Sequence, residues 1–262
     1  MGIKKKITSK TVIAAIVGGV FLVVGSILTA VLIRNPPSDT SSLEKSPPAS
    51  TIRLGKPIIE SKSFSVTDKY DPSGYMGDIG DILIEKTPDL IRFTYVTQGR
   101  GPHEWDWKYI NKEENLELAR FGGVMLLDPP NNWGLIENGG YDIRRFKTIS
   151  WEARSIEDNV YVEFLIGGVN WLWNDDTKTK EPTPYPDSLP RTSLGTYLLT
   201  SEFQTFQYDL SKIQDDYLMN VIGGFGWVVS WSSNGVHIND DHTAPIQSKT
   251  IVIEVEQIQY KK

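Results

Sequence analysis

The chain has 262 residues, of which 39% are hydrophobic and 23% are charged, and it contains no cysteine. The lack of cysteine excludes a disulfide-stapled domain and a lipid attached through cysteine. Five of the 27 basic residues precede residue 35, which leaves 22 basic against 33 acidic residues in the rest. Residues 35–262 are therefore acidic and repel nucleic acid and anionic lipid, so we expect no nucleic-acid partner.

The first predicted element is a membrane-spanning helix at residues 12–33. These 22 residues carry no charge, and at about 1.5 Å per residue the helix crosses a bilayer core of about 30 Å. Four lysines precede it and only Arg34 follows at once, so residues 1–11 are predicted to be a cytoplasmic tail. A cleaved signal peptide is the alternative, although its apolar region is usually shorter. We expect an uncleaved signal anchor, a single membrane pass, and a C-terminal domain outside the cytoplasm.

Residues 34–56 are predicted to be an extended linker. The segment is rich in Pro, Ser and Thr, and it has too few large apolar residues to pack. It leaves residues 57–262 as one domain, which is long enough to bury a core of its own.

This domain is predicted to consist of strands. Apolar and polar residues alternate at Ile91–Tyr95, Ile149–Arg154 and Val160–Ile166, which places one face of each strand on a core. Further strands are predicted at Pro57–Val66, Phe121–Leu127, Thr196–Thr200, Thr205–Leu210, Val221–Val229 and Thr250–Tyr260. Clusters of Gly, Pro, Asn and Asp separate them, which is typical of an antiparallel sandwich or jelly roll. A single short helix is predicted at Lys112–Ala119.

The last predicted strand contains an irregularity. Its apolar residues stand at odd positions up to Val255 and at even positions from Ile258. A slip of one residue within a strand predicts a β-bulge near Glu256–Gln257.

Two pairs of tryptophans predict a binding surface. Trp105 with Trp107, and Trp171 with Trp173, are two residues apart and have polar neighbours. In a strand each pair points to one side, and two adjacent indoles form an apolar platform for the C–H face of a sugar ring. The alternative is that they cover an edge of the sandwich. The tryptophans assigned to the core are Trp133, Trp151 and Trp227.

The predicted loops contain acidic pairs without the local pattern of a metal site or of an enzyme. Calcium binds six to eight oxygen ligands, and no stretch has the spacing of an EF-hand loop. The segment HINDDH at 237–242 offers His and Asp to zinc, but there is no H-E-x-x-H helix. There is also no G-x-S-x-G elbow, no P-loop and no marked pair of carboxylates.

An ordered set of segments resembles a known family. The segments are GYMGD, FGGVMLLDPPNNWG, GGYDIRRFKTISWEAR, VEFLIGG, PYPDS, YDLS and VIGGFGWVVS, in chain order. Over about residues 70–260 they are similar to the galactose-binding-like jelly rolls of carbohydrate-binding-module type on prokaryotic surface proteins. This resemblance implies a non-catalytic two-sheet sandwich that binds sugar on a concave sheet face or at loop tips, commonly with a structural calcium ion.

The resemblance also implies a place for the ion. The family ending L-D-D-I corresponds here to VEQI at 255–258, in which the second acid is replaced by an amide. Asp78 and Glu256 are the calcium candidates. The predicted ligand-binding residues are His103, Trp105, Trp107, Trp171, Trp173, Tyr185 and Asp187.

Together these features predict a membrane-anchored, non-catalytic domain that binds a polysaccharide or another glycan at the cell surface. The main alternative is a structural or protein-interaction domain of the cell envelope without a sugar ligand. A polysaccharide hydrolase is the third possibility.

Overall fold

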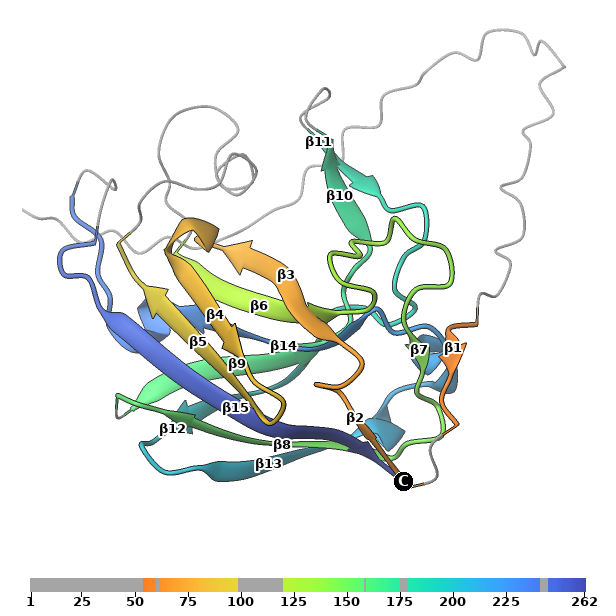
Figure 1. The fold of residues 1–262 in the computed structure, drawn as a ribbon. Helices are drawn as coiled ribbons and strands as arrows, with labels where there is room; N and C mark the ends of the chain where they lie inside the picture. Colours follow the sequence, from red (N-terminus) through yellow and green to blue (C-terminus); the bar gives the residue numbers. More distant parts are fainter. Residues whose placement is uncertain (1–53, 60–61, 99–119, 158, 175–178, 241–244) are drawn as a thin grey trace, which may run out of the picture. The chain divides into compact units, whose positions relative to one another are not determined.

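The computed structural model describes residues 54–59, 62–98, 120–157, 159–174, 179–240 and 245–262 (Figure 1). All of them belong to one compact unit, Ser50–Lys262. The predicted cytoplasmic tail, membrane anchor and nearly all of the linker lie outside the described residues, as does the helix predicted at 112–119. Among the residues that are described, no helix has the length and the apolar character needed to cross a membrane.

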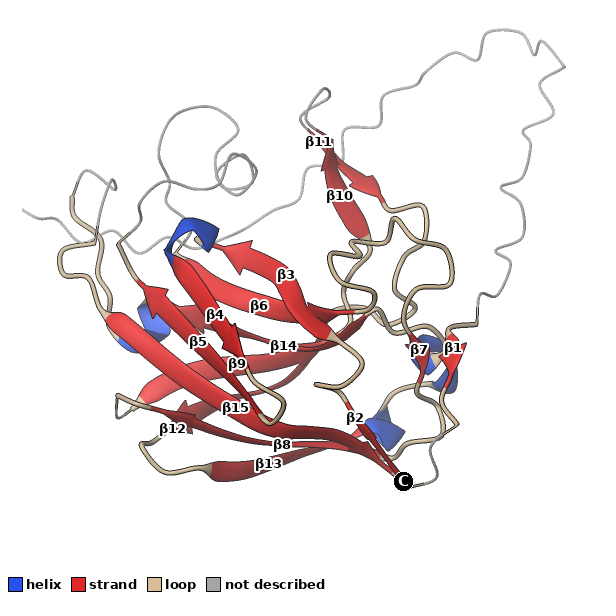
Figure 2. Ribbon diagram, in the orientation of Figure 1, coloured by secondary structure: helices blue, strands red, loops and turns tan. Residues whose placement is uncertain are grey.

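Two antiparallel sheets form the described domain, which confirms the predicted all-β sandwich (Figure 2). The five-stranded sheet has the order β12 (Thr192–Leu199), β9 (Val160–Ile166), β14 (Gly223–Ser230), β6 (Phe121–Leu127), β3 (Asp71–Gly77). The six-stranded sheet has the order β13 (Gln204–Asp209), β8 (Thr148–Ser155), β15 (Thr250–Lys261), β5 (Leu90–Val96), β4 (Ile82–Lys86), and β2 (Ser63–Ser65) also pairs with β15. The chain passes repeatedly from one sheet to the other, as in a jelly roll.

Smaller elements complete the domain. β1 (Lys56–Pro57) pairs in parallel with β7 (Tyr141–Asp142), and β10 (Trp171–Asn174) forms a hairpin with β11 (Thr179–Pro182). The helices in the described residues are short 3-10 turns: η1 (Ile79–Asp81), η2 (Leu210–Lys212), η3 (Asp215–Leu218) and η4 (Ser232–Asn234).

The core lies between the two sheets and is rich in aromatic rings. Trp151 of the six-stranded sheet lies 5.1 Å, centroid to centroid, from Phe164 of the five-stranded sheet. Trp227 of the five-stranded sheet packs edge-to-face on Phe93 of the six-stranded sheet, with 5.9 Å between the ring centroids. Both indoles are fully buried, so the assignment of Trp151 and Trp227 to the core is confirmed. Each such ring contributes about 1.5–3 kcal/mol of transfer free energy or more, which holds the sheets together.

Several predicted strands agree closely with the structure, and others differ from it. β6 and β9 have the predicted bounds, whereas the strand predicted at Pro57–Val66 is divided into β1 and β2. The edge strands β3 and β4 were not predicted. β3 contains Pro72 and Gly74, which sequence patterns treat as turn residues and which edge strands tolerate.

The predicted β-bulge is confirmed. The pairing of β15 with β8 breaks between Glu256 and Gln259, and Gln257 has a φ of 52°. Val255 and Ile258 are consequently both fully buried although their positions differ in parity.

Candidate functional site

The outward side of the five-stranded sheet carries a row of residues that crosses all five strands. Pairing places in register Met76, Gly123, Val228, Glu163 and Thr196. Paired residues share a side of the sheet, and their neighbours along the strands, such as Trp227 and Phe164, are buried in the core on the opposite side. We call the side of the sheet that bears this row the five-strand face.

An apolar cluster separate from the main core adjoins the row. It consists of Met125, Leu127, Leu165, Val169 and Ile222. Met76 and Val228 of the row pack against this cluster and are only partly buried, and Trp133 does the same from the loop after β6. The five-strand face therefore has an apolar floor.

Two glycines in the middle of this floor leave room for the methionine side chains that cover them. A Cβ at Gly123 would lie 2.6 Å from the carbonyl oxygen of Trp227 and 3.3 Å from Cε of Met76. A Cβ at Gly226 would lie 3.0 Å from Sδ of Met125. Both distances to the methionines are shorter than ordinary contacts, so glycine is what lets these two side chains lie close over the backbone.

A charged pair borders the apolar floor. Nη2 of Arg191 donates to Oε2 of Glu163 at 2.7 Å, and half of the Arg191 side chain is exposed. Burial alone would raise the pKa of Glu163, but hydrogen bonds from Arg191 and Ser193 outweigh it and lower the pKa. Glu163 is therefore ionised at neutral pH, and the pair offers acceptors and donors side by side.

Loops at one end of the five-strand face bring aromatic residues together. The backbone N–H of Tyr185 donates to the carbonyl of Gly134, next to Trp133, at 2.9 Å. The turn around Trp133 is held by the buried Asn132, whose Oδ1 accepts from the N–H of Gly134 at 3.0 Å. Trp171 begins the β10–β11 hairpin and is 36% exposed. Tyr185 is half-buried.

The assignment of Trp133 to the core is corrected by its position. The indole is partly exposed and packs on the cluster of the five-strand face rather than between the sheets. The glycine-rich turn that led to the core assignment places this side chain against the cluster, where it stays partly exposed. Trp133 is thus the aromatic residue of this end that sequence patterns missed.

Asp187 lies beneath these loops and not on their surface. Its carboxylate accepts from the backbone N–H groups of Leu189, Ile222 and Gly223 at 3.0, 3.1 and 2.9 Å. Burial raises its pKa to about 7, although the backbone N–H groups favour the ionised form. The structure therefore gives Asp187 the role of joining the loop of Tyr185 to the start of β14.

The other predicted ligand-binding residues are described in part or not at all. His103, Trp105 and Trp107 lie outside the described residues. For Trp173 the structure describes the backbone, which pairs with Lys180 in the hairpin. These four residues remain predictions, and the candidate site is built without them.

The two calcium candidates do not meet. Asp78 is buried beside β5, with its Oδ2 3.5 Å from the hydroxyl of Tyr95, while Glu256 is paired with Leu90. Leu90 and Tyr95 are five residues apart along β5, or about 17 Å at the usual rise of a strand. Within the described part of the chain, no three His, Asp or Glu side chains gather closely enough to hold a metal ion. Asp78 and Glu256 therefore do not fit a shared calcium site.

The outward side of the six-stranded sheet has a different chemistry. Pairing aligns Glu85, Arg92, Glu254 and Arg154 across four strands. Arg92 and Arg154 approach the two carboxylate oxygens of Glu254 at 2.5 and 2.6 Å, and the Glu254 side chain is 1% exposed. The polar groups of this row largely satisfy one another, so it offers less to a ligand than the five-strand face.

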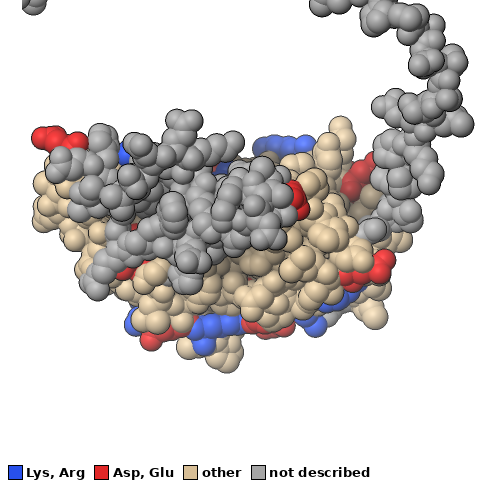
Figure 3. Space-filling view, turned by 90° about the horizontal axis from the view of Figure 1, so that it is seen from above, with Lys and Arg blue, Asp and Glu red and all other residues tan. Residues whose placement is uncertain are grey.

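The space-filling view in Figure 3 adds the distribution of charge. Where described residues are visible from above, the Lys, Arg, Asp and Glu side chains lie mostly toward the margin of the view. Uncharged residues make up most of the described surface that this view leaves visible.

Comparisons with known proteins find similarity only among solved structures. No family model and no curated protein matches the chain. A variant of the family 29 carbohydrate-binding module complexed with cellulohexaose has 10% identity and a TM-score of 0.34, covering 77% of this chain and 92% of that one. A variant complexed with mannohexaose has 8% identity and a TM-score of 0.33 with the same coverage. The solved structures that the chain is similar to are thus carbohydrate-binding modules, as the sequence resemblance led us to expect, but at these TM-scores the likeness carries no argument about fold or ligand.

Proposed function

We propose that residues 57–262 bind carbohydrate chains without catalysis, through the five-strand face. The observation that carries this proposal is an apolar floor bordered by an exposed ion pair, with aromatic residues at one end. A sugar ring has an apolar C–H face and a rim of hydroxyls, so Met76 and Val228 suit its face and Glu163 with Arg191 suits its rim. Trp133, Trp171 and Tyr185 would stack on a further ring of the same chain.

The same row argues for binding rather than hydrolysis. Glycosidases use two carboxylates about 5–10 Å apart, one of them a general acid with a raised pKa. Glu163 is the single carboxylate among the five residues of the row, and its pKa is lowered. The arrangement therefore favours a ligand that is held and released unchanged.

The proposal includes the location of the domain. The charge-free segment at residues 12–33 would anchor the protein in a membrane, with the preceding lysines in the cytoplasm. The Pro- and Ser-rich residues 34–56 would hold the domain away from the lipid surface, where a polymer can reach the sheet. The protein would then act at the cell surface.

The test is binding of the full-length protein in lipid nanodiscs to a panel of soluble polysaccharides, in calcium and in EDTA. Trp171→Ala should weaken binding by about tenfold, because loss of an aromatic contact residue commonly costs more than 1 kcal/mol. Tyr217→Ala is the matched control, since Tyr217 is also exposed but lies on η3. The melting temperature of both variants should stay close to that of the parent protein.

Each other outcome has a defined meaning. Equal binding by Trp171→Ala and the parent would remove the aromatic loops from the site. If the folded parent protein binds no polysaccharide in either buffer, the proposal fails and a protein-interaction role is favoured. Binding that is the same in calcium and EDTA would show that no removable calcium ion organises the site.

A further inference from the structure

A second, separate feature is a tight turn that presents two adjacent arginines. In the sequence Ile143-Arg144-Arg145-Phe146, the two outer residues are buried in the core, with at most 1% of each exposed. The N–H of Ile143 donates to the carbonyl of Leu218 at 2.9 Å, and that of Phe146 to the carbonyl of Ile143 at 3.0 Å. The buried ends of the turn fix its backbone, so Arg144 and Arg145 are held at the surface in a defined position.

The first arginine is already neutralised. Nε and Nη2 of Arg144 donate to the two oxygens of Asp142 at 2.9 and 2.6 Å, and the backbone N–H of Arg144 donates to the same carboxylate. Burial by itself would raise the pKa of Asp142, but these hydrogen bonds lower it, so the pair stays ionised. Arg144 is therefore held in place by Asp142, and its guanidinium has fewer free donors for a ligand than an unpaired arginine.

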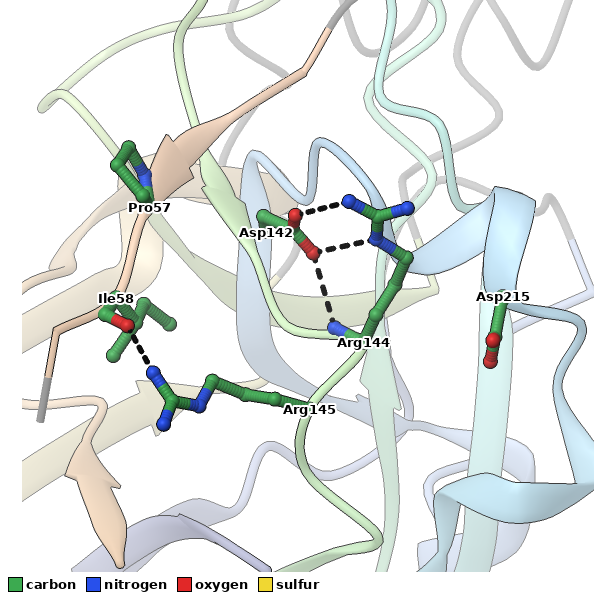
Figure 4. A pocket seen from close by; sticks show the side chains of 6 residues that line it. All are labelled: Pro57, Ile58, Asp142, Arg144, Arg145 and Asp215. Carbon is green, nitrogen blue, oxygen red and sulfur yellow. Dashed lines mark hydrogen bonds and ion pairs between the residues drawn. The ribbon is translucent and has the colours of Figure 1, made fainter. Parts of the chain in front are cut away.

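The second arginine keeps donors available. Nη1 of Arg145 donates to the carbonyl of Ile58 at 2.5 Å, and within the described part of the chain Arg145 forms no ion pair. This contact holds the guanidinium against the backbone just after β1 and leaves Nη2 and Nε for another partner (Figure 4). An exposed guanidinium that is held in place loses little entropy when it binds a carboxylate.

These side chains line a hollow of about 430 Å³. Its lining residues are Pro57, Ile58, Asp142, Arg144, Arg145 and Asp215. Figure 4 shows Pro57 and Ile58 on one side, Asp215 on the other, and the two arginines between them. The volume lies within the range of small-molecule sites, but the lining is mainly charged, whereas such sites are mostly apolar.

We propose that this hollow binds a small polyhydroxylated carboxylate, of the chemistry of a uronic acid residue. Arg145 holds the carboxylate with its remaining donors, and the exposed carboxylate of Asp215 accepts from hydroxyl groups at the other end. Pro57 and Ile58 supply the apolar contact for the ring. A phosphate would bring a higher charge of the same sign to the carboxylate of Asp215, which disfavours it.

The hollow is distinct from the five-strand face. It is formed by β1, by β7 with the turn after it, and by η3, none of which belongs to the two large sheets. Its ligand is an acid, whereas the row on the five-strand face suits the hydroxyl rim of any sugar. Failure of either proposal is therefore separable from failure of the other.

The test uses the full-length protein in nanodiscs and isothermal titration with D-glucuronate, D-glucose and acetate. Glucuronate should bind in the millimolar range, and glucose, which lacks the carboxylate, should bind at least tenfold more weakly. Arg145→Gln should reduce the affinity for glucuronate at least tenfold. Lys261→Gln removes the same charge at an exposed position of β15 and should leave the affinity unchanged.

Asp215→Ala tests the other end of the ligand, because it removes both carboxylate acceptors. This change should lower the ratio of glucuronate to acetate affinity, because acetate has no hydroxyl group for Asp215 to accept from. Trp171→Ala should leave glucuronate binding unchanged. Equal affinities for glucuronate and glucose, or unchanged binding by Arg145→Gln with its fold intact, would overturn the proposal.

Discussion

The buried carboxylate of Asp187 leads to a prediction about how stability depends on pH. No cationic side chain contacts it within the described residues, and its partners are backbone N–H groups. Burial raises its pKa to about 7 from the ordinary value of 3.8. The folded protein thus keeps a proton that the unfolded chain has already lost between about pH 4 and pH 7.

This difference in bound protons determines the sign and the size of the change in the free energy of unfolding with pH. Because the folded state binds more protons in that window, the free energy of unfolding must fall as pH rises through it. A shift of about three units corresponds to about 4 kcal/mol in total, at about 1.36 kcal/mol per unit. Between pH 5 and pH 8 the same linkage predicts a loss of about 2–3 kcal/mol.

Urea denaturation at pH 5, 6, 7 and 8 measures this slope, with Asp187→Asn as the comparison. The amide does not titrate, so the parent protein should lose about 2–3 kcal/mol more than the variant across the range. Carboxylates whose pKa is lowered, such as Glu163 and Glu254, lose their contribution only at lower pH. Equal slopes for parent and variant would refute the reasoning, because they would mean that the backbone N–H groups keep Asp187 ionised throughout.

Two further predictions concern the two outward sheet faces. Glu254→Gln should destabilise the domain by about 1–2 kcal/mol in the same denaturation assay, because it weakens the hydrogen bonds of the buried carboxylate to Arg92 and Arg154, whose own charges stay partly in water. Glu85→Gln, at an exposed position of the same row, should change stability by less than about 0.5 kcal/mol. A smaller loss for Glu254→Gln would show that the two arginines find water or other partners. Gly123→Ala should cost about 1–3 kcal/mol, because its Cβ would lie 2.6 Å from the Trp227 carbonyl oxygen, and it should also weaken polysaccharide binding by shifting Met76. An alanine variant with unchanged stability and unchanged binding would show that glycine is not required there.

Local periodicity was sufficient to predict much of the fold. β6 and β9 have apolar residues in a pattern that one strand shows by itself, and the bulge at Gln257 appears as a change of parity within one strand. Nothing comparable marks β3, whose Pro72 and Gly74 are acceptable only because it is an edge strand. Whether a strand is at an edge depends on distant pairings, which a single sequence does not show.

The candidate site was harder to predict for the same reason. Glu163 becomes the neighbour of Val228 and Thr196 only through the register of β9 with β14 and β12. Tryptophan-rich segments drew attention to Trp171, whereas the glycines of FGGV were treated as strand residues without a role in a site. In the structure Gly123 of this segment has no side chain to displace Met76, so the thioether side chain of Met76 lies close over the backbone of the five-strand face.

Asp187 shows why a polar residue in a predicted loop is an ambiguous signal. In sequence it stands between Pro186 and Ser188, beside Tyr185, and suits an exposed contact with a sugar hydroxyl. In the structure, backbone N–H groups from two other positions of the chain, at the start of β14 and at Leu189, donate to its carboxylate. Burying one carboxylate satisfies all of them at once, and this places the aromatic loop over the five-strand face. In the proposed site Asp187 would therefore position the loop of Tyr185 and would not contact the sugar itself.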